Sequence, residues 1–426
     1  MNVFSSASWM LFEKTMRILI NFLSIAYIAN AIGPEVFGRI NYLYNIGFVI
    51  FTISSLGLDQ IVINTIAKSP TSLAIVRESM LIRFVAFLFL FMLSIPYVKY
   101  GLKLDYIYAL LIMCFIYTVV MPIDNYCVAI SDTRTISLVK LIAFFVSSCS
   151  KVYCASLGDL SAVILSFLIE PIFIILYSLF FYNKFIKMVS LRDKLTEVDY
   201  RHVVPVFLSL VIITLYNKLD QLLVANFMGF EEMGVYAVAA SIASAFSVVP
   251  NTITQALFPK TLGDLSTAIT LNFIYKLNSM LAVMSILGVA LFGQFVIGAF
   301  FGSEYEKAYF ILLIMLLSNW VKALGFAFNL YVISHQMQKY SIYYYLSGVM
   351  TLSVFSVLLI PTLGSYGAAL SALLAQIFAN IIAPLFINKA FFRCGIVDML
   401  KSSTIGAFSL LRDFRVIFDA RKNIIS

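Results

Sequence analysis

The chain has 426 residues, of which 62% are hydrophobic and only 12% are charged. Soluble domains carry about 45–50% apolar and about 25% charged residues, so this chain cannot cover a water-exposed surface of its size. The same numbers exclude a disordered chain, a collagen and a coiled coil. The apolar runs are long, whereas a membrane barrel shows short alternating strands. The composition therefore predicts an all-α polytopic membrane protein.

Twelve apolar runs reach the length of about 20 residues that a membrane-spanning helix needs. They cover residues 5–31, 40–67, 78–98, 105–127, 136–155, 160–182, 203–228, 235–259, 274–300, 308–333, 341–360 and 366–388. The first nine residues carry no basic residue, so no cleavable signal peptide is expected. The five cysteines and two histidines form no ligand pattern, so neither a metal nor a cofactor is expected.

Basic residues gather on one side of the predicted spans. If the N-terminus is cytoplasmic, most of the 29 Lys and Arg residues lie at the inner side. The outer loops hold only Arg39, Lys99, Lys103, Lys151 and Lys307, and the spans hold Lys14, Arg17, Arg83, Lys218 and Lys322. By the positive-inside rule this predicts a multi-pass membrane protein with both termini in the cytoplasm. The net charge of +8 then reports basic cytoplasmic loops, and no nucleic-acid partner is expected.

Two segments of the chain resemble each other. Residues 21–46 (NFLSIAYIANAIGPEVFGRINYLYNI) align without gaps with residues 217–242 (NKLDQLLVANFMGFEEMGVYAVAASI). The identical pairs are Asn21/Asn217, Leu23/Leu219, Ala29/Ala225, Asn30/Asn226, Gly33/Gly229, Glu35/Glu231, Gly38/Gly234 and Ile46/Ile242. The shared Gly suits the left-handed position that ends a helix, and the shared Glu suits the first turn of the next one. A weaker echo pairs LGDLSA at 157–162 with LGSYGA at 363–368.

The duplication predicts two parallel six-helix repeats, an arrangement typical of transporters. We expect an N-terminal bundle at 1–182, a cytoplasmic linker at 183–202, a C-terminal bundle at 203–388 and a cytoplasmic tail at 389–426. In the tail, apolar residues recur at helical spacing from Ile405 to Phe418, which predicts an amphipathic helix on the inner membrane surface. A frayed basic tail is the alternative.

The chain resembles the Wzx-type O-antigen and polysaccharide lipid flippases, which are polysaccharide biosynthesis proteins of the MOP superfamily. The segments that carry the resemblance are SWMLFEKTMRI, ANAIGPEVFGRIN and SLGLDQ in the first half, and KLDQLLVANFMGFEEMGVYAVA and LGSYGAALSALLAQ in the second. The resemblance implies a V-shaped, MATE-like pair of bundles around a central cavity, with alternating access. It also implies an undecaprenyl-diphosphate-linked oligosaccharide as substrate, and a polysaccharide polymerase and chain-length complex as possible partners.

Charged residues within the predicted spans are the candidate functional residues, because a charge at bilayer depth costs at least about 2.5–3.5 kcal/mol. The candidates for substrate binding in a cationic cavity are Lys14, Arg17, Asn21, Arg83, Asn217, Lys218 and Lys322. The candidates for ion coupling are Glu170, Glu13 and Asp220. Basic residues outnumber acidic ones in this set, which favours an anionic diphosphate over a cation as substrate.

Several of these residues have a structural alternative. Glu13 and Arg17 are four residues apart and are placed to form an ion pair within one helix. Glu170 precedes Pro171, which can kink a helix, and its carboxyl either exchanges the coupling proton or pairs with a basic residue of a neighbouring helix. Arg83 lies near a span end and can extend its side chain to the inner surface. Asp59 and Asp124 are placed to cap a helix or to form an ion pair.

The expected function is translocation of a lipid-linked oligosaccharide from the inner to the outer leaflet, coupled to H⁺ or Na⁺. A multidrug/cation antiporter of the same superfamily is the alternative, disfavoured by the sign of the charges. An enzyme that acts on lipid-linked sugars would need a sizeable outer loop for its catalytic groups. The predicted outer loops are too short for that, so no enzymatic activity is expected.

Overall fold

The computed structural model describes residues 3–68, 74–97, 118, 121–130, 133–181, 203–257, 266–335, 337, 339–387 and 390–405. All regular structure in these ranges is helical. The first half contains α1 (Val3–Ser55), α2 (Leu58–Lys68), α3 (Ala74–Tyr97), α5 (Thr133–Ser156), α6 (Leu160–Ser166), α7 (Ile169–Phe181) and α9 (Val203–Met228). The second half contains α10 (Phe230–Leu257), α11 (Ser266–Phe301), η4 (Ser303–Tyr305), α12 (Ala308–Ser334), α13 (Lys339–Leu363), α14 (Ser365–Ile377), η5 (Phe378–Ile382), α15 (Ala383–Phe386) and α16 (Ala390–Ile405).

Eight of the described helices are long and apolar enough to cross a membrane. This confirms the predicted class, an all-α polytopic membrane protein. The number of twelve spans stays a prediction, and most of the predicted span 105–127 lies outside the described residues.

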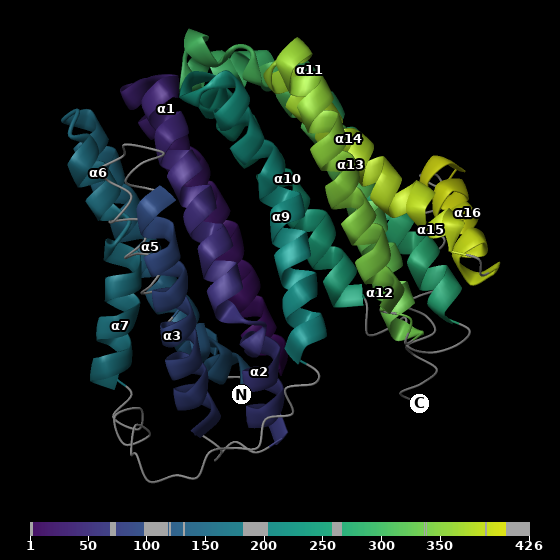
Figure 1. Ribbon diagram of the computed structural model, residues 1–426, viewed down its shortest axis with the longest axis horizontal. Helices are drawn as coiled ribbons and strands as arrows, with labels where there is room; N and C mark the ends of the chain where they lie inside the picture. Colours follow the sequence, from purple (N-terminus) through teal and green to yellow (C-terminus); the bar gives the residue numbers. More distant parts are fainter. Residues whose placement is uncertain are drawn as a thin grey trace. The chain divides into compact units, whose positions relative to one another are not determined.

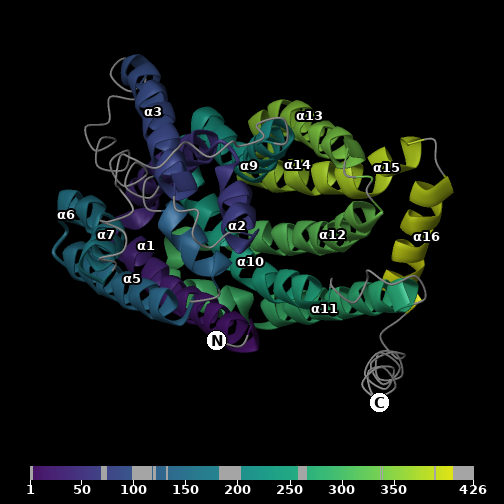
Figure 2. The same cartoon turned by 90° about the horizontal axis from the view of Figure 1, so that it is seen from below.

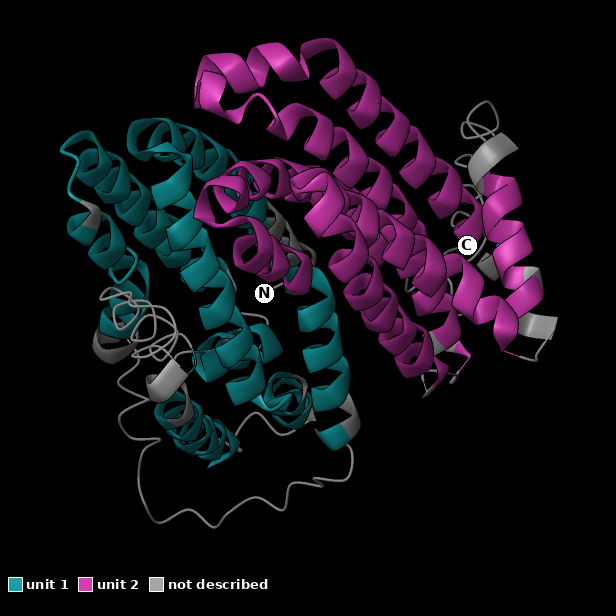
Figure 3. Ribbon diagram, turned by 45° about the horizontal axis from the view of Figure 1, so that its top comes forward, with its two compact units in different colours: residues 1–218 teal, residues 219–426 magenta. Residues whose placement is uncertain are grey.

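The chain divides into two compact units, Met1–Lys218 and Leu219–Ser426, which Figure 3 shows in teal and magenta. The boundary between them falls within α9. The predicted linker at 183–202 lies outside the described residues, and the predicted domain boundaries stay a prediction.

In the first unit, α5 packs against α1 on one side and against α7 on the other (Figures 1 and 2). The small buried side chains of Ala143, Ser147 and Ser148 let α5 approach its neighbours closely. The Ser147 hydroxyl donates to the Ser166 carbonyl over 2.9 Å, which ties α5 to the end of α6. The three helices α1, α5 and α7 frame the candidate site described below.

The repeated sequence motif forms the same local structure in both units. Gly33 interrupts α1 with a φ of 76°, and Gly229 separates α9 from α10 with a φ of 89°. An L-amino acid with a side chain is disfavoured at such a φ, which accounts for glycine at both positions. Glu231 lies in the first turn of α10, and Glu35 accepts from Arg39 over 2.6 Å one turn later in the same helix. The predicted helix ends are confirmed.

The weaker echo marks two more helix starts. Gly158 and Gly364 have φ angles of 71° and 61° and directly precede α6 and α14, respectively. Asp159 caps α6 by accepting a hydrogen bond from the Ala162 backbone N–H over 3.1 Å. The two echo segments therefore take equivalent places in the two units.

Two predicted continuous spans are broken in the structure. The span predicted at 40–67 is interrupted at Leu56 and Gly57, both at positive φ, where α1 ends and α2 begins. The span predicted at 160–182 is interrupted by a turn at 167–168 between α6 and α7. Around 167–168 the residues are nearly as apolar as the helices they separate, so hydrophobicity did not reveal that break. The break at 56–57 lies in the more polar segment SSLGLDQ, where two serines, a glycine and an aspartate mark the end of the apolar run.

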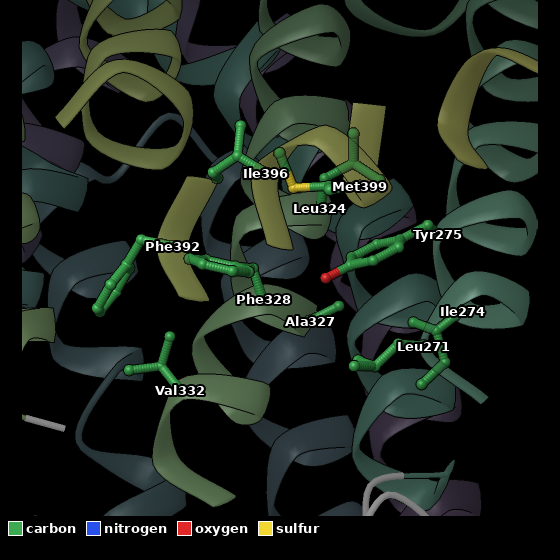
Figure 4. Close-up of a cluster of buried hydrophobic side chains, with 10 residues drawn as sticks. All are labelled: Leu271, Ile274, Tyr275, Leu324, Ala327, Phe328, Val332, Phe392, Ile396 and Met399. Carbon is green, nitrogen blue, oxygen red and sulfur yellow. The ribbon is translucent and has the colours of Figure 1, made fainter. Parts of the chain in front are cut away.

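The core of the second unit gathers residues from three helices, α11, α12 and α16. The cluster comprises Leu271, Ile274, Tyr275, Leu324, Ala327, Phe328, Val332, Phe392, Ile396 and Met399 (Figure 4). Phe392, Ile396 and Met399 lie on one face of α16, and that face packs on the bundle. A helix does form within the predicted tail, but its apolar face is buried in protein over 390–405, and the rest of the predicted amphipathic stretch lies outside the described residues.

Candidate functional site

The polar residues predicted to form one stripe on α1 lie in different surroundings. Glu13 and Ser24 are buried, Arg17 is partly exposed, and Asn21 is exposed. The Ser24 hydroxyl donates to the Ile20 carbonyl of its own helix over 2.7 Å, so it is satisfied locally. Within the stripe, the charged contact with another helix is made at its Glu13–Arg17 end, where Arg17 pairs with Glu170 of α7.

Arg17 holds two carboxylates. Its Nη1 donates to Glu13 Oε1 over 3.3 Å, and its Nη2 forms an ion pair with Glu170 Oε1 of α7. The side chains of Glu13 and Glu170 are only 11% and 7% exposed, whereas Arg17 is 29% exposed. The structure thus shows the predicted pair within α1 and, for Glu170, the alternative in which it pairs with a base on a neighbouring helix. The coupling role of Glu170 stays a prediction.

Glu170 and Pro171 lie in the first turn of α7. A proline there loses no helical hydrogen bond, because the N–H groups of a first turn have no partner within the helix. The break in this span therefore lies just before them, at 167–168, and not at the proline. It places Glu170 at a helix N-terminus, where the helix dipole favours a carboxylate.

Lys151 was predicted to lie in an outer loop, and this prediction is wrong. It is a buried residue of α5, and its ammonium lies 3.8 Å from the centroid of the Phe167 ring. It interacts electrostatically with both Glu170 and Arg17. On the same helix, the Phe144 ring lies 4.5 Å from the Arg17 guanidinium carbon.

These residues form one compact arrangement, the four-charge cluster, which consists of Glu13, Arg17, Lys151 and Glu170. Two acids and two bases make it neutral as a set. Aromatic faces at Phe144 and Phe167 cover the two cations, which is favourable where water is scarce. Lys14, one position along α1 from Glu13, is exposed.

Sequence reasoning missed Lys151, although α5 carried a signal. Ala143, Ser147, Ser148, Lys151 and Ala155 recur at helical spacing and are all buried. A small-residue stripe of this kind marks a helix–helix contact within a membrane, and a lysine on it faces protein.

Arg83 is not part of this cluster and does not extend to the surface. Its side chain is fully buried, and its Nη2 donates to Asp59 Oδ1 over 2.7 Å. The same Asp59 oxygen accepts from Asn125 Nδ2 over 2.5 Å. Asp124 forms an ion pair with Lys140 over 2.6 Å. Pairing was the expected alternative for both aspartates, and it is confirmed.

Three candidates lie on α9. Asn217 Nδ2 donates to the Ile213 carbonyl over 2.8 Å, and the Lys218 ammonium lies 5.5 Å from the centroid of the Phe48 ring. Asp220, in the second unit, accepts from the buried Tyr236 hydroxyl over 2.6 Å. The structure therefore gives Asp220 a neutral hydrogen-bond donor on α10.

Lys322 is a partly buried residue of α12 with polar neighbours along the same helix. Asn319 Nδ2 donates to the Ala243 carbonyl over 2.8 Å, and Trp320 Nε1 donates to the Ser279 hydroxyl over 3.1 Å. The substrate-binding and coupling roles of the predicted residues stay predictions, but the structure brings Glu13, Arg17 and Glu170 together.

No group of three or more His, Cys, Asp or Glu residues that would suit a metal ion occurs among the described residues. The four-charge cluster holds two carboxylates on one guanidinium, and the partly exposed side of that guanidinium is placed to contact an anion.

Comparisons with known proteins identify the family and the fold. The model of the family described as "Polysaccharide biosynthesis protein" matches residues 3–261. Among the curated proteins, none matches the chain.

Solved structures of transporters are similar along nearly the whole chain. The lipid II flippase MurJ in an inward closed conformation has a TM-score of 0.64 at 12% identity and covers 97% of this chain and 99% of its own. An inward-facing multidrug resistance MATE family transporter has a TM-score of 0.60 at 13% identity, covering 92% and 96%. A MOP superfamily transporter from Pyrococcus furiosus, described as having a binding pocket of reverse polarity, has a TM-score of 0.56 at 16% identity, covering 93% and 96%.

The likeness to these solved structures, at 12–16% sequence identity, shows the fold. The match to the family model shows the family. Both agree with the resemblance read from the repeated motifs. The chain belongs to the polysaccharide biosynthesis protein family and has the multi-pass membrane fold of the MOP-superfamily flippases and transporters.

Proposed function

We propose that the protein flips an undecaprenyl-diphosphate-linked oligosaccharide, a unit of O-antigen or a related surface polysaccharide, from the inner to the outer leaflet of the cytoplasmic membrane. The observation that carries this proposal is the match of the polysaccharide biosynthesis family model to residues 3–261. Unaided, each sugar hydroxyl and phosphate charge would lose its water at a cost of several kcal/mol. A path lined by polar and basic residues lowers that cost, while the polyprenyl tail stays in lipid.

The charges within the helices support an anionic substrate over a cationic one. The structure adds Lys140 and Lys151 on the basic side, and Asp59, Glu78 and Asp124 on the acidic side, of the set predicted from the sequence. The surplus therefore stays positive, as a diphosphate requires. The similar P. furiosus transporter is described by its reversed pocket polarity, so the fold itself does not fix the sign of the substrate.

The four-charge cluster is the proposed coupling site, with H⁺ or Na⁺ as the coupling ion. A proton that binds to the Glu170 carboxylate removes one of the two anions that hold Arg17. Arg17 is more exposed than Glu13 and Glu170, so its guanidinium is the group placed to turn toward a diphosphate when Glu170 is protonated. Lys151 stays over the Phe167 ring and keeps the cluster from becoming negative when both carboxylates are ionised.

A reconstituted transport assay tests the function. Vesicles containing the purified protein are loaded with a fluorescent undecaprenyl-diphosphate oligosaccharide, and its exposure to an impermeant quencher is followed with and without a proton or sodium gradient. We expect protein-dependent movement of this lipid. Movement of ethidium with no movement of the lipid would instead establish the cation antiporter.

Thiol labelling tests the proposed orientation, with both termini in the cytoplasm. In a background without the five native cysteines, single cysteines at Ser190 and Asp264 should be shielded from an impermeant reagent in intact cells. A cysteine at Ser303, which is exposed in η4, should react. Labelling at position 190 from outside would reverse the assignment.

A further inference from the structure

Among the described residues, a side-chain hydrogen bond with a buried donor joins the second helix of each unit to the third. In the first unit, Arg83 of α3 donates to Asp59 of α2 over 2.7 Å. In the second unit, Asn278 of α11 donates to Thr254 of α10 over 3.2 Å. Both pairs join residues 24 positions apart, and Arg83 and Asn278 are 0% and 1% exposed. The two cross-links therefore occupy equivalent places in the two repeats.

The two cross-links differ in charge. The pair in the second unit is an amide and a hydroxyl, and Asn278 also donates to the Ala323 carbonyl over 3.5 Å. The pair in the first unit is a full ion pair, supported by the Ser79 hydroxyl, which accepts from Arg83 Nε over 3.1 Å. Since the second unit makes the same connection with neutral groups, the repeat fold does not require charge there. Buried ions are costly at bilayer depth, so an ion pair that folding does not require indicates a functional role.

The backbone next to the ion pair is interrupted. Leu56 has a φ of 49° and Gly57 a φ of 70°, and Asp59 follows within the first turn of α2. In the second unit, α10 runs through Thr254 to Leu257 without such a break and has only Pro250 within it. A few residues at the end of an element that can absorb a change in φ and ψ are the usual hinge of a membrane transporter or a moving domain. Within the described residues, the first unit alone has both the charged cross-link and the break.

The ion-pair network is also incomplete in this conformation. Arg83 Nη1 is buried and has no hydrogen-bond partner in the described part of the chain; the same holds for Asn278 Oδ1 in the second unit, but that atom is uncharged. The Asp59 side chain, in contrast, is 31% exposed and lies on the short helix that follows the break. A guanidinium that is only partly satisfied here is poised to gain a partner in a second arrangement of α2 against α3.

We propose that Asp59 and Arg83 form a releasable lock, in which the ion pair holds α2 against α3 in one state of the transport cycle and opens in another about the hinge at Leu56–Gly57. Asn125 positions Asp59 through its 2.5 Å hydrogen bond. The neutral Asn278–Thr254 pair keeps α10 and α11 together throughout. This assigns Arg83 a positioning role, in place of the substrate contact predicted from the sequence. The transport consequence rests on the proposed flippase function, whereas the motion does not.

The chain supplies its own test variant, Asp59→Thr with Arg83→Asn, which installs the second unit's pair in the first unit. We expect this double variant to accumulate in the membrane and to unfold at the wild-type temperature within a few degrees. Its transport of the fluorescent lipid-linked oligosaccharide should fall by at least about tenfold, within the range of typical conformational couplings. The matched control, Asn278→Gln in the second unit, perturbs the neutral cross-link and should lower stability more than it lowers turnover per folded molecule.

A distance measurement tests the motion without any substrate. Spin labels at Ala67 of α2 and Val85 of α3, both exposed, should show two populated distances in the wild-type protein and one in the double variant. Wild-type transport by a stable double variant would overturn the lock, and so would a double variant that fails to fold, since the second unit implies that neutral residues suffice. A single wild-type distance would also overturn it. Failure of the wild-type protein to move the lipid, with two distances present, would overturn the proposed function and leave the lock standing.

Discussion

Replacing Glu170 by glutamine removes one of the two carboxylates that hold Arg17, and it separates a coupling role from a structural one. Arg17 keeps Glu13 at 3.3 Å and is 29% exposed, so it is not left as an unpaired buried charge. For Arg17 the loss then resembles that of one hydrogen bond to a charged group, about 1.5–3 kcal/mol. The buried Lys151 also loses the attraction of Glu170 but keeps its contact with the Phe167 ring. Arg17→Ala instead leaves two buried carboxylates without their shared cation, which costs about 3–5 kcal/mol. We therefore expect Arg17→Ala to be the more destabilising change.

The assay measures stability and coupling on the same preparations. The free energy of unfolding is measured by denaturant titration in detergent micelles, and transport is measured in vesicles with an imposed proton gradient. Glu170→Gln should remain folded and bind the lipid-linked oligosaccharide, but its transport should no longer respond to the gradient. The control is Glu35→Gln, because Glu35 is 60% exposed and its carboxylate accepts from Arg39 of the same helix. It should change neither measurement.

Two results would refute this reasoning. If Glu170→Gln were as unstable as Arg17→Ala, then Glu13 would not stabilise the arginine as its position implies. If Glu170→Gln were stable and its transport still followed the gradient, Glu170 would not carry the coupling proton. If wild-type transport responded to a sodium gradient and not to a proton gradient, sodium would be the coupling ion. Transport by Glu170→Gln should then no longer respond to the sodium gradient.

Three further changes have outcomes that the structure or the charge pattern predicts. Lys322→Ala should impair polysaccharide export while the protein accumulates normally, and Lys322→Arg should retain more export; equal export by both would show that the charge is not required. Gly325→Ala places a Cβ 1.9 Å from Asn380 Oδ1, and this overpacking should lower the free energy of unfolding by about 1–3 kcal/mol. The control is Gly288→Ala, whose Cβ would have no atom within 4 Å and which should be neutral or slightly stabilising in the same unfolding titration. Lys307→Met removes an exposed ion pair with Glu232, so it should lower the free energy of unfolding by at most about 1 kcal/mol. The same ion pair raises the pKa of Lys307 above its usual value of 10.5. The difference in stability from wild type should therefore persist below pH 10.5 and vanish as the pH rises through the raised pKa.

The helix ends were predictable because their cause is local. Gly33 and Gly229 mark turns through a backbone conformation that the glycine itself permits, and the Glu that follows each one suits the helix start. Nothing distant in the chain is needed to interpret such a motif. Its recurrence after about half the chain then indicates duplication, which the equivalent helix starts at Gly158 and Gly364 support.

The contents of the four-charge cluster were only partly predictable. Glu13 and Arg17 share one helix, so their pairing follows from spacing alone. The Arg17–Glu170 pair joins residues 153 positions apart, and no pattern within either helix identifies the partner. Lys151 was misplaced because it lies close to the end of an apolar run, where a lysine is ordinarily a surface residue. Only the packing of α5 between α1 and α7 shows that it is enclosed.

The balance of basic and acidic residues within the helices indicates the charge of a transporter's substrate only after the residues that form internal ion pairs are left out of the count. Arg17 and Arg83 looked like phosphate ligands in the sequence, yet each is engaged by carboxylates of its own unit. An engaged arginine binds a phosphate only if its carboxylate releases it, by protonation or by movement of a helix. The exposed Lys14 carries no such requirement. A basic excess thus has two components, cations that meet the substrate directly and cations whose availability depends on the state of the transporter. In the proposed flippase, the second kind would couple the binding of an anionic head group to conformational change.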